Sequence, residues 1–307
     1  MRTNLSRPIL LQRINRVLRF LPAAALCVPA AVHDARVATR RLREALPVVA
    51  RGKKGRALLK AVRRVTRALG PVRELDVALT TLAEFGASRG VSRDSIVRVR
   101  TAIAEERRQL CARLSRRLAR CDVKGLGQRV VDQTTVPLTT LAARALLADV
   151  EDRCGRRAAR LRGAIETAAG IYLPDRLHDV RIRVKKLRYA MELAQDLRNA
   201  RRAARPARAS GSTKAESARL RTLRQVQELL GRMNDLEVLI ARMRALQGTS
   251  TVTGLRVSAD LDQVVRMIEN ECRVLHGKYM AARGSVLAVC DYAEATIKKR
   301  ERASRAA

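Results

Sequence analysis

The chain has 307 residues, and its 64 Lys and Arg against 29 Asp and Glu give a formal net charge of +35 at pH 7. Hydrophobic residues make up 47% of the chain but aromatic residues only 2%, so the core must consist of Leu, Val, Ile and Ala, which disfavours an aromatic-rich β-sandwich. No apolar run approaches the ~20 residues of a membrane span, and the charge excess indicates a polyanionic partner because self-repulsion destabilises a compact chain.

Helical spacing of apolar residues runs through almost the whole chain. It predicts four helices, then a linker over residues 122–137 that contains Gly125 and Gly127, and then four more helices. The Gly70-Pro71 step should kink the third helix without ending it, because apolar spacing resumes at Leu75. The predicted helices span residues 6–21, 31–50, 54–85, 94–120, 138–170, 175–203, 214–247 and 258–303.

The two halves of the chain repeat two motifs. HDARVATRRLR at residues 33–43 returns as HDVRIRVKKLR at residues 178–188, and LG-x-x-RELD at residue 69 returns as LG-x-x-NDLE at residue 230. The first pair is 145 residues apart and the second 161, so the second half holds 16 extra residues, which fit a flexible basic insertion near 199–217. We infer an internal duplication, with repeat one at about 6–121 and repeat two at about 138–303, and an all-α fold of two pseudo-symmetric four-helix bundles.

The repeated motif arranges its cations along one side of a helix. At 100° per residue, the four basic side chains of the first copy share a stripe about 80° wide, opposite apolar residues such as Leu42 and Leu46. The stripes consist of His33, Arg36, Arg40 and Arg43 in the first copy, and of His178, Arg181, Lys185 and Arg188 in the second. Arg41 and Lys186 lie to the side of these stripes.

The helix after each motif adds a second basic row. In the first repeat four cations fall within about 60° of one another: Arg56, Lys60, Arg63 and Arg67. The second repeat keeps Arg221 and Arg224 at matching places but has Ser217 and Glu228 at the other two. Its basic surface should therefore be weaker.

Rows of this kind suit an extended polyanion. Residues at i, i+3, i+7 and i+10 span about 15 Å along the helix axis, which is long enough to meet several successive phosphates. Like charges on one exposed stripe repel by tenths of a kcal/mol per neighbouring pair, and solvated charged faces normally mix both signs. A histidine between arginines can gain a proton when a phosphate arrives, which predicts tighter binding in mild acid.

Acidic residues and cysteines are assigned structural roles. Asp34 and Asp179 should lie in first helical turns, where the helix dipole favours them. Four other carboxylates should brace the basic rows by ion pairing and not bind a metal: Glu74, Asp76, Asp235 and Glu237. The six cysteines form no C-x-x-C pair, so we expect small buried hydrophobes in a reducing cytoplasm: Cys27, Cys111, Cys121, Cys154, Cys272 and Cys290. Pro22 and Pro29 interrupt the early apolar run at residues 20–25, which argues against a signal peptide.

The paired H-D-x-R-x-x-x-[RK]-[RK]-L-R and G-x-x-[RN]-[DE]-L-[DE] segments resemble the CHAD domain, the conserved histidine α-helical domain, over about residues 6–303. The resemblance implies two four-helix bundles with a basic groove or pore between them that binds inorganic polyphosphate, and association with polyphosphate granules. The insertion and the weaker row at Ser217 and Glu228 depart from twofold equivalence. The predicted polyphosphate-binding residues are His33, Arg36, Arg40, Arg41, Arg43, Arg56, Lys60, Arg63, Arg67, His178, Arg181, Lys185, Lys186, Arg188, Arg221 and Arg224.

Three other functions compete with this interpretation. The chain lacks phosphate-loop, zinc-protease and serine-hydrolase motifs, and it lacks the E-x-E-x-K run of the triphosphate tunnel domains that often accompany the family, so we expect no catalysis, cofactor or metal. Weak nucleic-acid binding is expected because phosphate contacts are independent of sequence, but the lack of aromatic residues disfavours base stacking. Membrane-surface attachment is disfavoured because the basic first helix has no aromatic anchor beyond Phe20.

Overall fold

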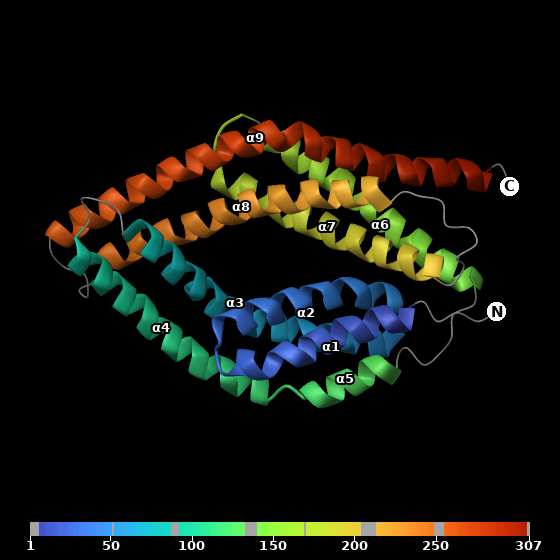
Figure 1. Ribbon diagram of the computed structural model, residues 1–307, viewed down its shortest axis with the longest axis horizontal. Coiled ribbons are helices and arrows are strands. Elements are labelled where there is room, and N and C mark those ends of the chain that lie inside the picture. The colour runs from blue at the N-terminus through green and yellow to red at the C-terminus, as the bar shows by residue number, and fades with distance from the viewer. Residues whose placement is uncertain are drawn as a thin grey trace.

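The computed structural model describes residues 6–50, 52–86, 92–132, 140–168, 170–203, 213–248 and 255–305. These residues form helices and short turns, and no strand occurs among them. The all-α prediction is therefore confirmed (Figure 1). The helices are α1 (Ser6–Ala25), α2 (Pro29–Val49), α3 (Gly52–Gly86), α4 (Arg93–Ala119), α5 (Val123–Asp132), α6 (Thr140–Thr167), α7 (Pro174–Ala203), α8 (Thr213–Gln247) and α9 (Leu255–Arg305).

The helices pack in two groups that follow chain order. In the first group α1 packs on α2, α2 on α3 and α3 on α4, and α5 covers α1. In the second group α6 packs on α7, α7 on α8 and α8 on α9, and α9 returns to pack along α6. The closing contact between α1 and α4 is much smaller than the one between α6 and α9. A pseudo-twofold relation between the groups stays a prediction.

The apolar residues that helical spacing assigns to the core are buried in the structure. Leu42 and Leu46 of α2 are fully buried, and so are Val180, Val184 and Leu187 of α7. Each such side chain contributes roughly 1.5–3 kcal/mol when it leaves water. Because these positions face inward, the basic stripes on the same two helices must face away from the cores of their own groups.

The two groups meet along α2 and α7 and again at one end of the molecule. At that end α3 and α4 lie against α8 and α9, on the left of Figure 1. Polar contacts tie it together: Arg232 of α8 pairs with Glu84 of α3 at 2.7 Å, and Ser95 of α4 donates to Asp260 of α9 at 2.5 Å. The opposite half of the interface lies among α2, α3, α6 and α7.

Several element boundaries differ from the predicted ones. Part of the predicted linker at 122–137 is the helix α5, because Leu126 and Val130 form a buried apolar edge and Asp122 accepts a hydrogen bond from the Gly125 N–H at 2.7 Å. Helix α1 continues through Pro22 to Ala25, and α3 continues through Gly70-Pro71 as predicted. The ends of the predicted insertion, at 199–203 and 213–217, are helical, and residues 204–212 lie outside the described residues.

The prediction that all six cysteines are free is wrong. Cys27 and Cys111 form a disulfide that joins the turn after α1 to α4. In the same place Arg107 donates to the Cys27 carbonyl at 2.8 Å, and Ser115 donates to the Ala25 carbonyl at 2.5 Å. The partners are 84 residues apart in sequence, so no local spacing could reveal them. Three of the other cysteines are buried as predicted: Cys154, Cys272 and Cys290.

None of the helices in the described ranges is long and apolar enough to cross a membrane.

Candidate polyanion-binding cleft

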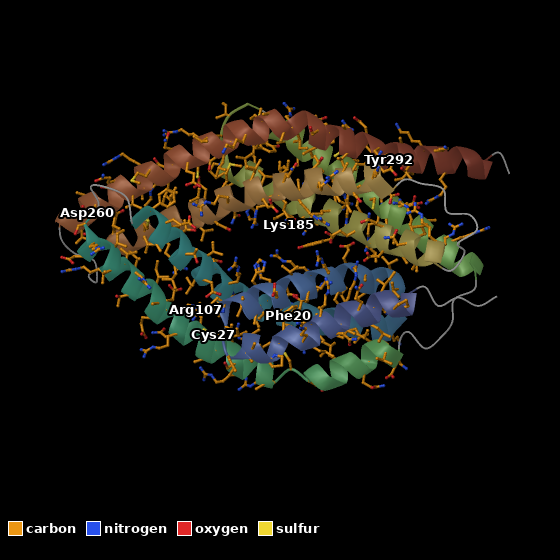
Figure 2. The ribbon with its side chains drawn as sticks, viewed as in Figure 1. Phe20, Cys27, Arg107, Lys185, Asp260 and Tyr292 are labelled. Atoms are coloured by element: carbon orange, nitrogen blue, oxygen red, sulfur yellow. A yellow bond between two sulfur atoms is a disulfide. The ribbon has the colours of Figure 1, made fainter. Side chains whose placement is uncertain are left out.

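A cleft opens where α2 and α3 of the first group face α6 and α7 of the second. It holds about 900 Å³ of empty space, part of which is open to solvent. Seven of its described lining side chains are Lys or Arg, whereas Glu44 is the one carboxylate among them. Figure 2 labels one of the cations, Lys185, in the space between the two groups. We call this the basic cleft; its cations are Arg40, Arg43, Arg63, Arg153, Arg157, Lys185 and Lys186.

The single carboxylate of the basic cleft is already engaged. Glu44 is buried and lies 3.1 Å from the guanidinium of Arg153 and 2.7 Å from that of Arg157. Arg157 also donates to the backbone carbonyl of Lys186 at 2.6 Å, which ties α6 to α7. Within the described part of the chain, the five other cations have no carboxylate within ion-pair distance: Arg40, Arg43, Arg63, Lys185 and Lys186.

The cations are close enough to alter one another's proton affinity. Burial, followed by the charges of Arg181, Arg40 and Arg36, lowers the pKa of Lys185 to about 7. Burial also lowers the pKa of Arg36 to about 10, with Arg40 and Arg181 as the next causes. For Arg43 burial lowers the pKa first and Arg63 second. A cluster of mutually repelling, partly dehydrated cations is stabilised by any anion that enters it.

Known proteins resemble this chain in sequence and in fold. A family model, the CHAD domain, matches residues 9–244, which is most of the chain. The chain belongs to the CHAD family. The crystal structure of the CHAD domain from the plant Ricinus communis matches with a TM-score of 0.62 at 19% identity, covering 95% of this chain and 92% of that one. PptA from Streptomyces chartreusis matches with a TM-score of 0.59 at 15% identity, covering 92% of this chain and 99% of that one. No curated protein matches the chain.

This CHAD chain has a second cleft, between α1–α2 and α7–α8, with about 670 Å³ of empty space. It lies on another side of α2 from the basic cleft, since Arg41 lines it and Arg40 does not. Two of its four described arginines pair closely with carboxylates: Arg13 lies 2.7 Å from Asp196, and Arg41 lies 3.3 Å from Glu192. We call it the paired cleft; its described lining residues are Gln12, Arg13, Arg16, Ala38, Arg41, Glu192, Gln195, Asp196 and Arg224.

Glu192 is the centre of that pairing. Besides Arg41, it accepts a hydrogen bond from Arg188 at 2.8 Å and lies 3.7 Å from Arg224. Glu192 and Arg188 are both buried, and the Arg188 guanidinium also lies 4.6 Å from the centre of the Tyr189 ring. Three cations that the sequence assigns to polyphosphate therefore share one carboxylate within the protein.

The structure divides the sixteen predicted residues of this CHAD domain into three sets. The basic cleft brings together Arg40, Arg43, Arg63, Lys185 and Lys186. Three more lie near enough to cleft cations to lower their pKa values: Arg36, which donates to the Thr66 carbonyl at 3.2 Å, Arg181, which lies 3.8 Å from Asp235, and Arg67. The remaining eight belong to neither set: His33, Arg41, Arg56, Lys60, His178, Arg188, Arg221 and Arg224.

The two motif histidines have different neighbours. The ring Nδ1 of His178 lies 2.5 Å from Oδ1 of Asn234. The residue equivalent to Asn234 in the first repeat is Arg73, and its charge, after burial, lowers the pKa of His33. Proton uptake by His33 is therefore disfavoured, and Lys185, with a pKa lowered to about 7, is better placed to gain a proton when an anion enters the cleft.

Of the four carboxylates predicted to brace the basic rows, Asp235 does so, through Arg181. Glu74 raises the pKa of Arg36 by its charge but lies 3.8 Å from Arg242. The prediction is wrong for the other two. Asp76 binds Arg107 of α4 at 2.6 Å, and Glu237 accepts a hydrogen bond from Tyr172 at 2.6 Å.

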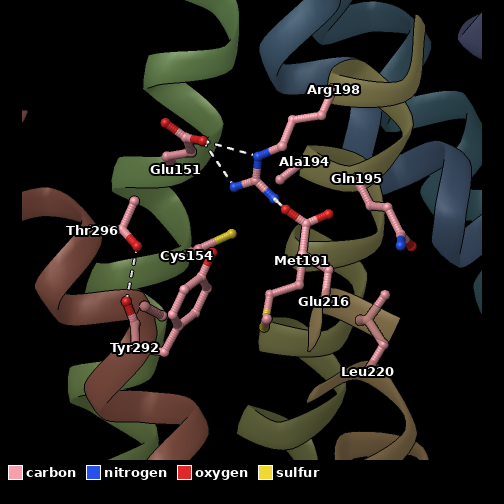
Figure 3. Close-up of a pocket in the computed structure, with 11 residues that line it drawn as sticks. Glu151, Cys154, Met191, Ala194, Gln195, Arg198, Glu216, Leu220, Tyr292 and Thr296 are labelled. Atoms are coloured by element: carbon pink, nitrogen blue, oxygen red, sulfur yellow. Dashed lines mark hydrogen bonds and ion pairs between the residues drawn. The ribbon is translucent and has the colours of Figure 1, made fainter. Parts of the chain in front are cut away.

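A third pocket lies inside the second group and is too acidic for a polyanion. Figure 3 shows Arg198 held between two carboxylates, Glu151 at 2.8 Å and Glu216 at 3.1 Å. Burial raises the pKa of the neighbouring Cys154 thiol to about 12, so this cysteine is unreactive near neutral pH. The other residues that line this pocket are mainly apolar, as in the packed core of a helical bundle.

Sequence reasoning missed Arg153 and Arg157, which supply the α6 wall of the basic cleft. The available signal was weak: two arginines four residues apart lie on one helix face, but α6 holds many arginines and carries no repeated motif. The role of Glu192 was also missed. Its signal was clearer, because Glu192 follows Arg188 by four residues, which is an ion-pairing distance on a helix.

Proposed function

We propose that this CHAD protein binds inorganic polyphosphate in the basic cleft and does so without catalysing a reaction. The observation that carries the proposal is the charge of the cleft, where seven cations from four helices face one carboxylate that two of them already hold. The CHAD family is linked to polyphosphate binding in general. In a cell that stores polyphosphate, such a cleft would hold the protein on polyphosphate granules.

The chemistry of the cleft suits a chain of phosphates. Arg40, Arg43 and Arg63 present guanidinium groups, whose planar N–H donors match phosphate oxygens in pairs. Arg40 and Arg43 lie on α2, and Lys185 and Lys186 lie on α7. The cations therefore line the cleft from two facing helices and are not gathered at one spot. Two rows can contact successive phosphates along a strand, whereas a single orthophosphate would reach only a few of them.

Nucleic acid is the main competing ligand. Among the described lining residues Tyr189 is the one aromatic side chain; it is buried, and the Arg188 guanidinium lies over its ring, so it offers no free surface on which a base could stack. Nucleic acid should therefore bind through its phosphates alone. At fixed salt, long polyphosphate should displace labelled single-stranded DNA and RNA from the protein, and displacement in the opposite sense would favour a nucleic-acid function.

Calorimetry with polyphosphate of defined length tests the proposal. Arg43→Glu combined with Arg63→Glu should weaken binding at least about a hundredfold, because two charge-assisted contacts of ~1.5–3 kcal/mol each become repulsive. With five to seven phosphate contacts, the slope of log affinity against log salt should lie between about −3.5 and −5 on the single-strand estimate.

A matched control separates the cleft from the overall charge. Arg98 and Arg100 are exposed near the start of α4, beside the end of α3, where Gly86 lies against Ile96. Arg63 is about 35 Å away from that end along α3. Arg98→Glu with Arg100→Glu changes the net charge by the same amount and should weaken binding by no more than a few-fold. Equal losses in the two double variants would show that no particular cleft binds the polyanion.

A further inference from the structure

Lys185 is an amine surrounded by cations in a cleft that attracts anions. It is half-buried on α7, and it makes no hydrogen bond or ion pair with any residue that the structure describes. The carboxylates nearby have other partners: Glu44 holds Arg153 and Arg157, and Asp235 lies 3.8 Å from Arg181. The charged and titratable groups around Lys185 are Arg36, Arg40, Arg43 and Glu44 of α2, Arg63 of α3, Arg153 and Arg157 of α6, Arg181, Lys186 and Tyr189 of α7, and Asp235 of α8.

This environment favours the neutral amine, which is the nucleophilic form. Burial lowers the pKa of Lys185 to about 7, helped by the charges of Arg181, Arg40 and Arg36. At pH 7.5 a large part of its population is therefore unprotonated, whereas an ordinary exposed lysine with a pKa of about 10.4 is only ~0.1% neutral. Lysines activated in this way, by dehydration or by a neighbouring cation, act as nucleophiles in enzymes.

We propose that Lys185 is a modification site, which small acyl phosphates acylate without the help of an enzyme. The phosphate end of the reagent binds the arginines of the basic cleft, and this places its carbonyl carbon next to the Lys185 Nζ. The amine nitrogen attacks that carbon, a C–N bond forms, and the bond from carbon to the phosphate oxygen breaks. Inorganic phosphate leaves with the electron pair, and the amine proton goes to solvent, so the products are an amide and phosphate.

The arginines contribute to both steps of this reaction. Their positive charge concentrates the anionic reagent in the cleft and stabilises the negative charge that the departing phosphate gains. Arg40 has two effects on Lys185, since it lines the same cleft and also lowers the pKa of the amine. The proposal rests on the cationic cleft and not on polyphosphate as its natural ligand. Acylation would remove one positive charge from the cleft and would thereby oppose polyphosphate binding.

The test uses the full chain with acetyl phosphate at pH 7.5, and peptide mass spectrometry measures acetylation at each lysine over time. Lys278, an exposed lysine on α9, is the reference site. Lys185 should react at least about tenfold faster than Lys278, because its larger neutral fraction outweighs the lower nucleophilicity and access of a buried amine. Its rate should level off above about pH 7.5, whereas the rate at Lys278 should keep rising. Arg40→Gln should slow the reaction at Lys185.

Acetic anhydride, an uncharged reagent, separates recruitment of the anion from reactivity of the amine. The preference for Lys185 over Lys278 should be several-fold smaller with the anhydride than with acetyl phosphate, because the cleft attracts only the anion. Equal rates at Lys185 and Lys278 with acetyl phosphate, or a Lys185 rate that rises without a plateau to pH 10, would overturn the proposal.

The same samples distinguish this inference from the proposed function. If polyphosphate binds in calorimetry but Lys185 reacts no faster than Lys278, the modification site is refuted and the polyphosphate site survives. If Lys185 reacts selectively but polyphosphate neither binds nor protects it, the reverse holds. If both hold, long polyphosphate should protect Lys185 at least about tenfold while leaving Lys278 unchanged, since a bound polyanion both covers the amine and favours its charged form.

Discussion

The basic cleft and the paired cleft use the same repeated motif and differ in whether its arginines are free. Arg43 and Arg188 are equivalent residues of the two copies. Four residues after Arg188 comes Glu192, which binds it on the same helix face; four residues after Arg43 comes Pro47, which has no side-chain acceptor. Arg188 therefore has a carboxylate partner one helical turn later, whereas Arg43 has none at the equivalent position.

The largest change in stability and binding should come from Glu192→Gln, which removes a negative charge from the paired cleft. Glu192 is the carboxylate partner of three arginines, and its removal leaves the buried Arg188 without an anion. The free energy of unfolding should fall by about 3 kcal/mol, as it does when one partner of a buried ion pair is lost. Urea denaturation measures this loss. Calorimetry on the same variant should show an additional polyphosphate-binding site, because Arg41 and Arg224, which line the paired cleft, lose their carboxylate partner.

Glu228→Gln is the matched control for that variant. Glu228 is exposed on α8, and it has no polar partner in the described part of the chain. Removing its charge should change the stability by no more than about 0.5 kcal/mol and should add no binding site. If Glu192→Gln changes neither the stability nor the number of binding sites more than Glu228→Gln does, the Glu192 carboxylate is not what keeps polyphosphate out of the paired cleft.

A smaller effect should follow from the reciprocal change, Pro47→Glu, which adds a carboxylate to the basic cleft. Pro47 lines that cleft on α2, and a glutamate there can pair with Arg43, four residues before it. Polyphosphate affinity should fall about tenfold, because one charge-assisted contact is satisfied internally and the cleft gains a repelling carboxylate. Pro47→Gln introduces a side chain of the same size without charge, and its affinity should stay within about twofold of the wild type. Equal losses in both variants would assign the effect to shape and not to charge.

Much of the fold was predictable because its cause is local. The spacing of Leu42 and Leu46 in α2, and of Val180, Val184 and Leu187 in α7, identifies a buried face without reference to any other helix. The helix α5 was missed because the glycines at 125 and 127 outweighed the apolar pair Leu126 and Val130. The Cys27–Cys111 disulfide was missed because its partners meet only through packing of α4 beside the turn after α1.

The sequence predicts many of the cations of the basic cleft, but not which helices face one another to form it. A helical wheel correctly puts Arg40 and Arg43 on one side of α2, and Arg41 to the side of them. It does not show that α6 lies opposite the first side, or that α1, α7 and α8 line the cleft on the second side. These arrangements depend on contacts between segments far apart in sequence. That packing brings Arg153 into the basic cleft and Asp196 into the paired one. Tertiary contact, and not motif content, selects which residues share a cleft.

The last expected effect is a pH dependence that only the basic cleft should show. Lys185 belongs to the basic cleft, whereas all four described cations that line the paired cleft are arginines. Below the Lys185 pKa of about 7 the amine is charged before polyphosphate arrives, so affinity is at its maximum. Above it, binding requires proton uptake, and affinity should fall with pH by at most about tenfold per unit, until the pH exceeds the raised pKa of the bound state.

Calorimetry between pH 6 and 9 should therefore give weaker binding above pH 7 in the wild type and a flatter profile in Lys185→Arg, whose guanidinium stays charged. Lys186→Arg is the matched control, because Lys186 lines the same cleft but is exposed, and its profile should follow the wild type. In Glu192→Gln the additional site should show no such decline, since arginines keep their charge over this range. A pH profile that Lys185→Arg leaves unchanged would move the titrating group elsewhere, with His33 as the next candidate. Because the pKa of His33 is lowered from 6.5, that decline would fall below pH 7 and not above it.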